Sequence, residues 1–409
     1  MKDFFQVQNL AAILKRREMF AVVATEQVPL TSAVERILAR PAVADVDLPG
    51  FPRSTMDGYA LAAADTYGAS ESNPAYFQVI GSVAMGETPA QQTGSGQTLR
   101  IATGGMLPAG CDSVVMVEHT EHLDETTIEV YQSVAPGQHL VAADEDFARD
   151  TAILEAGRRL RPQEVGLMAA IGQDPVTVYR RPLVGVISTG DEIVGVDTRP
   201  APGQIRDVNS YTLASLIHTA GGESRLYGIV KDSFQDLRER CVQALGACDM
   251  VLISGGSSVG QRDYTIKVLQ SLGGSEILAH GVTISPGKPT ILARVAGKSI
   301  WGLPGHVTSA MVVFDALVRP FLQWVGGRRN ALTQKARVKA RLSRNVASVP
   351  GRVDFIRVRL VKTAEGLKAE PILGKSGLLR TMVEADGIIE IDINSEGLDK
   401  NTNVTVYIF

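Results

Sequence analysis

The sequence predicts a multidomain protein of the α/β plus β class, built around a central doubly wound α/β domain. Strand-like and helix-like segments alternate between about residues 183 and 322, which is typical of a parallel sheet with helices on both faces. Short β-prone runs separated by Gly and Pro fill residues 48–138, and the part from about 330 to 409 is β-rich again. A chain of 409 residues corresponds to about two to four domains.

The amino-acid composition argues against several classes of protein. Hydrophobic residues make up 44% of the chain and charged residues 21%, which argues against disorder. The net charge of −3 gives no general indication of nucleic-acid binding. Cys111, Cys241 and Cys248 form no CxxC pair, so neither a disulfide framework nor a structural zinc site is expected. Because the sequence shows no signal-peptide pattern and no apolar run of about 18 residues, we expect a cytoplasmic protein without a membrane partner.

The first stretch is predicted to be helical. Ser32 and Glu35 have the spacing of a capping box, apolar residues at 34, 37 and 38 follow on one face, and Pro41 would end the helix. After it, β-prone runs at 76–80, 113–118 and 127–131 predict strands of a small β domain.

Residues 139–178 return to mixed character. Pro162 suits the first turn of a helix, Glu164 complements the dipole of that helix, and Gly172 suits its C-terminal cap. We expect residues 1–47 and 139–178 to pack together as one discontinuous linker domain. The β domain at 48–138 would then be an insertion.

The central domain is predicted to span residues 179–328. The continuously apolar run at 183–188 predicts a buried parallel strand, and further strands are expected at 223–230 and 249–253. Helices are expected near 209–220, at 233–245, from Asp263 onward and after Gly305. The last part, residues 329–409, is predicted to be a small β barrel with strands at 337–342 and 354–360 and one short helix near 378–384.

Unusual residues follow the predicted strands, where ligands bind in open α/β sheets. These segments are Thr189-Gly190-Asp191-Glu192, Lys231-Asp232, the run SGGSSVGQRD from Ser254 to Asp263, Pro286-Gly287-Lys288-Pro289 and Gly302-Leu303-Pro304-Gly305. Glycines let backbone N–H groups approach phosphate oxygens, and a helix N-terminus at Asp263 adds favourable potential. The loop at 254–260 is therefore predicted to hold a phosphorylated ligand.

Charged side chains complete this candidate site. Glu192, Asp232 and Asp263 can share a divalent cation, and Lys288 can bind an anion as a point charge. The alternatives are an ordinary turn for the glycine loop, helix caps for the carboxylates and a solvated surface position for Lys288. A Ser–His–Asp triad is not expected, since the six histidines carry no distinctive motif. His306 is interpreted as a capping or ligand-lining residue.

At these residues the sequence resembles the MoeA family, the molybdopterin molybdenumtransferases, whose animal relative is the gephyrin E domain. The resemblance covers essentially the whole chain in order. The matching stretches are STMDGYAL at 54–61, RIATGGMLPAGCDSVVMVE at 100–118, EDFARDTAILEAGRRLRPQEVGLMAAIG at 145–172, STGDEI at 188–193, DVNSYTLASLI at 207–217, SGGSSVGQRDYT at 254–265, SPGKPTILA at 285–293, GLPG at 302–305, PGRVDFIRV at 350–358 and GKSGLLRTMVEADGIIEI at 374–391.

The resemblance implies a subunit of four parts: a discontinuous helical linker domain, an inserted β domain, a MogA-like α/β domain and a C-terminal β barrel. It implies a homodimer whose site lies between the α/β domain of one subunit and the inserted β domain of the other. It also implies a reaction in which adenylylated molybdopterin and molybdate give molybdenum cofactor and AMP, with Mg²⁺ as cofactor. The adenylyltransferase protein that makes the substrate is an expected partner.

The resemblance also implies roles for individual residues. Catalytic roles fall on Asp57, Thr103, Asp146, Glu192, Asp232 and Asp263, of which Asp232, Asp263 and Glu192 are the expected metal ligands. Lys288, Pro289 and Arg352 match the region that receives the oxyanion. The residues expected to bind substrate are Gly190, Asp191, Ser254, Gly255, Gly256, Ser257, Ser258, Gly260, Pro304, Gly305, Lys288, Pro289, Arg352 and Ser376.

Two departures from the family pattern bear on the oxyanion. Where the family often has KPGKP, this chain has Ser285 in place of the first lysine, and where the family often has GLPGNP it continues with His306-Val307. The lost cation gives the hypothesis of a different metal preference, such as tungstate. Two other functions stay open: a molybdopterin adenylyltransferase, whose loop typically reads closer to GGTGPTxRDxT, and a non-catalytic molybdopterin-binding scaffold.

Overall fold

The protein is described from a computed structural model that covers residues 7–255, 264–329 and 336–409. Contacts divide the chain into two compact units, which are described separately. The first unit comprises residues 1–40, 156–161 and 175–409, and the second comprises residues 41–155 and 162–174. This division is coarser than the four predicted domains, whose boundaries stay a prediction. In the described part of the chain, no helix is long and apolar enough to cross a membrane.

The centre of the first unit is a six-stranded sheet in the order β17-β14-β18-β22-β21-β19. The first four strands are parallel and the last two pair antiparallel. The bounds are β17 (Glu223–Val230), β14 (Leu183–Thr189), β18 (Met250–Ser254), β22 (Lys298–Leu303), β21 (Ile291–Val295) and β19 (Glu276–His280). The predicted strands at 183–188, 223–230 and 249–253 are confirmed, and the antiparallel edge adds to the predicted parallel sheet.

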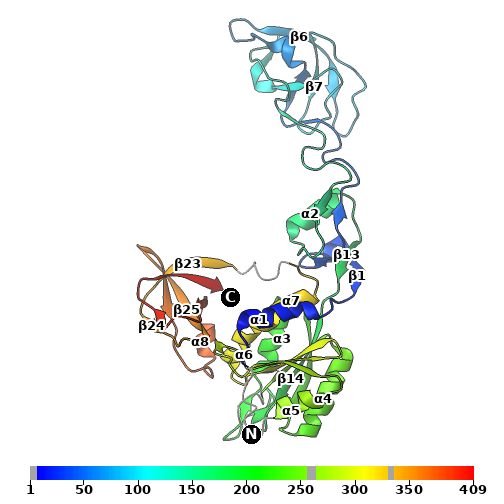
Figure 1. Ribbon diagram of the computed structural model, residues 1–409. Helices are drawn as coiled ribbons and strands as arrows, with labels where there is room; N and C mark the ends of the chain where they lie inside the picture. The colour runs from blue at the N-terminus through cyan, green and yellow to red at the C-terminus, as the bar shows by residue number, and fades with distance from the viewer. Residues whose placement is uncertain (1–6, 256–263, 330–335) are drawn as a thin grey trace. The chain divides into compact units, whose positions relative to one another are not determined.

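Helices cover both faces of this sheet, as predicted (Figure 1). One face packs against α3 (Asn209–Thr219), α6 (Val307–Val313) and α7 (Arg319–Val325), and the other against α4 (Phe234–Ala247) and α5 (Tyr264–Ser271). Ser233 caps α4, since its Oγ accepts the N–H of Asp236 at 3.4 Å. Leu237, Cys241 and Ala244 then form the buried stripe of that helix, because they recur at helical spacing.

The last helical segment is interrupted between α6 and α7. Phe314–Val318 forms a π-helical turn, and Pro320 stands in the first turn of α7. Proline has no backbone N–H to donate to the preceding turn, so the regular hydrogen-bond ladder cannot continue through it. The apolar face is nevertheless continuous: Phe321 packs edge-on against the buried Trp301, with ring centroids 4.9 Å apart.

The C-terminal part of the first unit is a closed five-stranded barrel. The strands run in the order β25-β26-β23-β29-β27, and β27 pairs again with β25. They are β25 (Val353–Thr363), β26 (Gly366–Pro371), β23 (Arg337–Leu342), β29 (Asn403–Ile408) and β27 (Gly387–Ile391), with α8 (Arg380–Val383) between β26 and β27. The predicted barrel and its short helix are confirmed. Closure leaves the barrel without the free edges of an open sheet.

A short strand joins the barrel to the α/β part. β20 (Ile284–Ser285) pairs in parallel with the start of β25, so that Ile284 lies opposite Val353 and Ser285 opposite Asp354. Two further small ladders in this unit are β15 (Ile193–Val194) with β16 (Ile205–Arg206), and β24 (Val346–Ala347) with β28 (Gly397–Leu398).

The predicted helix after Ser32 is wrong. The region contains α1 (Leu10–Lys15), the 3-10 turns Arg16–Met19 and Leu30–Ser32, β1 (Thr25–Val28) and β2 (Ile37–Leu38), and both strands pair with β13 (Val176–Tyr179). Glu35 has a φ of +66°, which no continuous α-helix accommodates. Pairing with β13, about 140 residues away in sequence, overrides the local capping pattern, as strand pairing often does.

The second unit contains a six-stranded sheet in the order β8-β5-β7-β6-β10-β9. Its strands are β8 (Ser113–Met116), β5 (Gly58–Leu61), β7 (Gln97–Ile101), β6 (Ala75–Val83), β10 (Thr127–Val130) and β9 (Thr120–His122), with 3-10 turns at Ala63–Thr66 and Val117–His119. The three predicted β-prone runs fall on β6, β8 and β10. The predicted helix at Pro162 is α2 (Pro162–Ala170), and Gly172 beyond it has a φ of +68°.

The chain enters and leaves this sheet through paired strands. β3 (Ala42–Val43) pairs with β12 (Ala152–Leu154), and β4 (Arg53–Ser54) pairs with β11 (Leu140–Val141). An additional backbone bond joins the N–H of Ala44 to the carbonyl of Thr151 at 3.0 Å. The incoming and outgoing segments are therefore held side by side.

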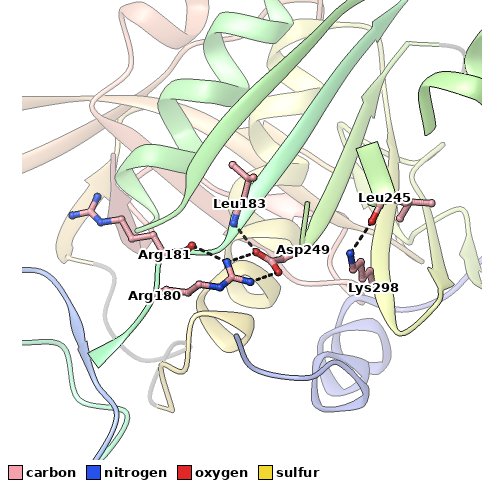
Figure 2. A network of polar contacts seen from close by, with 6 residues as sticks. All are labelled: Arg180, Arg181, Leu183, Leu245, Asp249 and Lys298. Atoms are coloured by element: carbon pink, nitrogen blue, oxygen red, sulfur yellow. Dashed lines mark hydrogen bonds and ion pairs between the residues drawn. The ribbon is translucent and has the colours of Figure 1, made fainter. Parts of the chain in front are cut away.

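An ion pair fixes the amino end of the central sheet in the first unit. The guanidinium of Arg180 donates to both carboxylate oxygens of Asp249, at 2.7 and 2.6 Å, and the N–H of Leu183 donates to the same carboxylate at 2.8 Å (Figure 2). Burial raises the pKa of Asp249, but the bonds from Arg180 and Leu183 together lower it more, so the pKa lies below its ordinary value. The pair joins the segment before β14 to the start of β18.

Replacing Asp249 with Asn should destabilise the protein by roughly 1–2 kcal/mol at pH 7, because charge-assisted bonds are lost while partial exposure screens the pair. A carboxyl whose folded-state pKa is lowered contributes stability that is present above the ordinary pKa of about 3.9 and disappears as the pH falls through the lowered value. The stability difference from the wild type, measured by urea unfolding, should therefore shrink below about pH 4. A difference that stayed constant down to pH 2 would contradict this assignment.

Candidate functional site

The carboxyl ends of the parallel strands bring several predicted residues together. The hydroxyl of Thr189, the last residue of β14, donates to Oδ1 of Asp232 at 3.1 Å. The N–H of Asp232 donates to Oδ1 of Asp191 at 3.2 Å, and the N–H of Gly190 donates to the carbonyl of Val230 at 3.2 Å. Because β14 and β17 are parallel neighbours, the loops that follow them meet at one edge of the sheet.

Glu192 approaches the same edge closely. A Cβ atom added to Gly190 would lie 2.6 Å from Oε2 of Glu192, and Gly190 has a φ of +150°. Glycine is therefore required at this position for the Glu192 carboxylate to fold back over the strand end. Both Asp191 and Glu192 are exposed, so their oxygens are accessible to a ligand.

The donor set at this edge suits a hard cation. Asp191, Glu192 and Asp232 offer only carboxylate oxygens, which Mg²⁺ prefers. Within the described residues, no group of three acidic, histidine or cysteine side chains is close enough to hold a metal ion. The third predicted ligand, Asp263, lies outside the described residues. The residues present thus fit a magnesium ion in chemistry, while the complete ligand set stays a prediction.

The described start of the predicted phosphate loop is tightly packed. Gly255 has a φ of +108°, and a Cβ atom there would lie 2.2 Å from the carbonyl oxygen of Thr189. Its N–H donates to the carbonyl of Leu303 at 3.2 Å. The first glycine of the loop therefore holds the end of β18 between the ends of β14 and β22. The predicted residues Gly256, Ser257, Ser258 and Gly260 lie outside the described residues.

Asn209 is a site residue that the sequence reasoning missed. Its Nδ2 donates to Oγ of Ser254 at 2.6 Å and to the carbonyl of Gly305 at 2.7 Å. It thereby joins the glycine loop to the predicted Pro304-Gly305 turn. Asn209 is buried, and its Oδ1 has no hydrogen-bond partner in the described structure. The available signal was the motif DVNS at 207–210, which was noted only as part of the family resemblance.

A second missed residue, Asp207, fixes the start of the same helix. Its Oδ1 accepts the hydroxyl of Ser188 at 3.2 Å and the N–H of Ser210 at 3.1 Å. Asp207 is buried. The carboxylate thus ties β14 to α3 directly below the residues that form the candidate site.

The predicted oxyanion residues gather where β20 meets β25. The N–H of Val282 donates to the carbonyl of Lys288 and the N–H of Val353 donates to the carbonyl of Thr283, both at 2.9 Å, so the loop that carries Lys288 folds back beside the segment that carries Arg352. The Nε of Arg352 lies 2.9 Å from a carboxylate oxygen of the buried Asp354. Lys288 is exposed. These bonds bring the backbone segments of both predicted cations to one junction, and Asp354 orients the arginine, since its Oδ2 accepts a hydrogen bond from Nη2 of Arg352 at 3.3 Å.

Ser376 meets the α/β part at the start of α6. Its hydroxyl lies 2.8 Å from Nδ1 of His306, and its carbonyl accepts the N–H of Thr308 at 3.3 Å. His306 occupies the N-cap position of α6 but makes no side-chain cap bond. Its ring instead contacts the loop between β26 and α8 that carries Ser376. His306 thus holds a predicted substrate residue, Ser376, beside Gly305.

In the second unit, Asp57 and Thr103 form a compact pair. Oδ1 of Asp57 accepts the backbone N–H of Thr103 at 2.7 Å and its hydroxyl at 3.0 Å. The bond from the N–H, and then the one from the hydroxyl, hold the pKa of Asp57 below its ordinary value. Both residues are exposed. Both bonds use Oδ1, so Oδ2 of this exposed carboxylate stays accessible to a ligand.

The segments around this pair are joined by further backbone bonds. The N–H of Gly104 donates to the carbonyl of Ser54 at 2.7 Å, and that of Ser54 donates to the carbonyl of Gly105 at 3.0 Å. The third predicted residue of this unit, Asp146, is exposed, and its N–H donates to the carbonyl of Leu48 at 3.0 Å. The two stretches STMDGYAL and RIATGG therefore form one local structure.

Comparison with known proteins agrees with this architecture. Residues 6–172 match the MoeA N-terminal region (domains I and II), residues 185–324 match a domain described as "Probable molybdopterin binding domain", and residues 339–409 match the MoeA C-terminal region (domain IV). A molybdopterin molybdenumtransferase of Nostoc sp. is 37% identical over 306 residues, which cover 74% of this chain and 70% of the relative. The chain belongs to the MoeA family.

Other relatives match this chain over nearly its whole length. A molybdopterin molybdenumtransferase of Bacillus subtilis is 30% identical over 388 residues, covering 93% of this chain and 89% of the relative. The crystal structure of a molybdopterin biosynthesis MoeA protein from Pyrococcus horikoshii is similar with a TM-score of 0.86 at 30% identity, covering 99% of this chain and all of the other. The resemblance inferred from the motifs is thus confirmed, together with the predicted fold class.

Replacing Thr103 with Val should raise the pKa of Asp57 toward its ordinary value, because the hydroxyl bond is lost while the backbone bond remains. NMR titration of the Asp57 side-chain carbonyl measures this shift directly. Thr103→Ser is the matched control, since it keeps the hydroxyl and should leave the pKa low. An unchanged pKa in the valine variant would show that the hydroxyl does not act on Asp57.

Proposed function

We propose that this MoeA-family protein is a molybdopterin molybdenumtransferase, an enzyme of molybdenum cofactor biosynthesis that inserts molybdenum into molybdopterin. The observation that carries this proposal is the arrangement of the first unit. Carboxylates share the carboxyl edge of the sheet with Ser254 and Gly255, the described start of the predicted glycine loop, and His306 connects that edge to the barrel loop of Ser376. The junction of β20 and β25 adds the cations of Lys288 and Arg352. Relatives named for this activity support the same conclusion.

The substrate that fits this arrangement is adenylylated molybdopterin together with molybdate. Hydrolysis of the phosphoanhydride by one water molecule releases AMP and leaves the terminal phosphate on the pterin, which retains the molybdenum. The glycine loop suits the phosphate groups of such a substrate because backbone N–H groups can approach phosphate oxygens closely. Molybdate is a tetrahedral dianion, and a flexible lysine and an oriented guanidinium are suitable partners for it.

Asp232 and Glu192 would hold Mg²⁺ together with Asp263. A bound magnesium ion would neutralise phosphate charge as the anhydride is cleaved. The protein's own contribution is to orient these carboxylates. Thr189 holds one oxygen of Asp232, and Gly190 allows Glu192 to fold over the strand end. Asn209 keeps the glycine loop and the Pro304-Gly305 turn in register.

A homodimer would complete the site, as the family resemblance implies. In this proposal, Asp57, Thr103 and Asp146 act on substrate bound by the α/β domain of the partner subunit. The lowered pKa of Asp57 supports an ionised carboxylate for this role. The adenylyltransferase protein would supply the substrate, since adenylylation must precede release of AMP.

Two alternatives predict different results in one assay. An adenylyltransferase would consume ATP and release pyrophosphate, and a scaffold would bind the pterin without turnover. The flanking regions argue against the first alternative, because the chain matches the MoeA N- and C-terminal regions as well as the α/β domain. Release of AMP that depends on molybdate distinguishes the transferase from both.

Replacing Asp232 with Asn should reduce molybdate-dependent AMP release by at least about 100-fold, because the expected metal loses a charged ligand. Thr189→Val should reduce the rate of AMP release about ten-fold, because it removes only one orienting hydrogen bond to Asp232. Asp236→Asn, in the first turn of α4, is the matched control and should retain activity. Wild-type rates in Asp232→Asn would remove this residue from the mechanism.

Replacing Ser285 with Lys restores the cation that the family often has beside the oxyanion. The apparent KM for molybdate should fall about three- to ten-fold with little change in kcat, since the added charge acts on binding. Ser285→Gln has a side chain of similar reach without charge and should not lower KM. Competition between molybdate and tungstate tests the hypothesis of a metal preference, which equal use of both at matched concentration would exclude.

A further inference from the structure

The first unit contains a cavity of about 280 Å³ at the opposite edge of the central sheet. Pro182, directly before β14, and Gly221, near the start of β17, line it. Both mark the amino ends of strands, whereas the proposed transferase site lies at the carboxyl ends. The cavity is therefore separate from the machinery described above.

Arginines dominate the lining. Three of the four Arg-Arg pairs in the sequence, at 158–159, 180–181 and 328–329, have one or both members in the lining of this cavity. The arginines that line it are Arg36, Arg159, Arg180, Arg181 and Arg328. Their concentration stands out because the chain as a whole carries a net charge of −3.

Carboxylates pair with at least three of these arginines. Arg159 pairs with Glu35, Arg36 pairs with Glu26, and Arg180 is held by Asp249. Only Glu35 among these carboxylates lines the cavity. The C-terminal ends of α3 and α7 also line it, and their carbonyls offset part of the remaining positive charge.

Arg181 leaves an excess of positive charge at this cavity. Arg181 makes no side-chain hydrogen bond or ion pair within the described residues, and its guanidinium points away from the Asp249 network (Figure 2). Arg328 is buried, with an exposed fraction of 9%. Burial lowers the pKa of Arg328, and the nearby charge of Arg159 lowers it further. Guanidinium groups held in each other's field favour a bound anion that would neutralise them.

We propose that this cavity binds a small phosphate-bearing ligand at a site separate from the transferase site. Guanidinium groups bind phosphate through paired N–H bonds, which suits a cavity lined by arginine rather than lysine. The volume is close to the lower end of the roughly 300–1,000 Å³ range of small-molecule sites, so it has room for more than a bare tetrahedral anion. Ile37, Pro182 and Leu322 supply apolar surface for the remainder of the ligand.

Equilibrium dialysis of the full chain with radiolabelled AMP, and separately with inorganic phosphate, tests this proposal. AMP should bind at two classes of site in the wild type. The affinity for AMP of the class that belongs to the cavity should fall by at least about ten-fold in Arg181→Glu, as expected for loss of a charged hydrogen-bond donor. Its affinity should also fall as ionic strength rises. Arg149→Glu, a charge reversal at an exposed arginine of the second unit, is the matched control.

The outcomes separate this site from the proposed function. If the transferase site does not bind AMP, only the class of AMP-binding site that belongs to the cavity remains. The affinity of that class should still fall in Arg181→Glu. If inorganic phosphate binds to the cavity with the same affinity as AMP, the phosphate group alone is recognised and the ligand is inorganic phosphate. The proposal is overturned if Arg181→Glu binds both AMP and phosphate with the same affinity as the wild type. This holds even if the variant has a lower Tm, because the arginines would then contribute only to folding. Arg181→Gln repeats the test if the charge reversal prevents folding.

Discussion

β14 pairs in parallel with β17 on one side and with β18 on the other, and this arrangement fixes where the chemistry of the first unit lies. Parallel strands place their carboxyl ends at the same edge, so the loops after all three strands converge there. The bonds from Thr189 to Asp232 and from Asn209 to Ser254 depend on that convergence. The same pairing places the amino ends, with Arg180, Arg181 and Asp249, at the opposite edge. One sheet thus separates two sites of different charge.

Local signals predicted the central domain well. The strand at 183–188 was recognisable because a strand buried on both faces is continuously apolar, and α4 was recognisable from its apolar stripe. The helix expected after Ser32 failed for the opposite reason. Its apolar residues pair with β13, a partner that no local pattern reveals. The antiparallel edge formed by β21 and β19 was missed although its pairing is local, since only Ala296-Gly297 separates β21 from β22.

The candidate site shows the same division. Glycines and carboxylates after strands could be read directly, because their position relative to a predicted strand indicates their role. The contact of His306 with Ser376 and the ion pair of Arg352 with Asp354 could not, because each depends on how the barrel joins the α/β part through β20. Asn209 escaped notice since an amide at the start of a helix has many ordinary explanations. Its role is visible only when Ser254 and Gly305 are seen on either side of it.

The paired entry and exit of the second unit bear on how such a chain can change over evolutionary time. β3 and β12 hold the incoming and outgoing segments side by side. For the rest of the chain, this unit is therefore equivalent to a loop whose two ends are held together. Closing such a loop has an entropic cost that grows only slowly with the number of residues between its ends. A change in the length of the inserted segment is therefore expected to cost the host sheet little stability, because the two ends of the segment are held together by their own pairing.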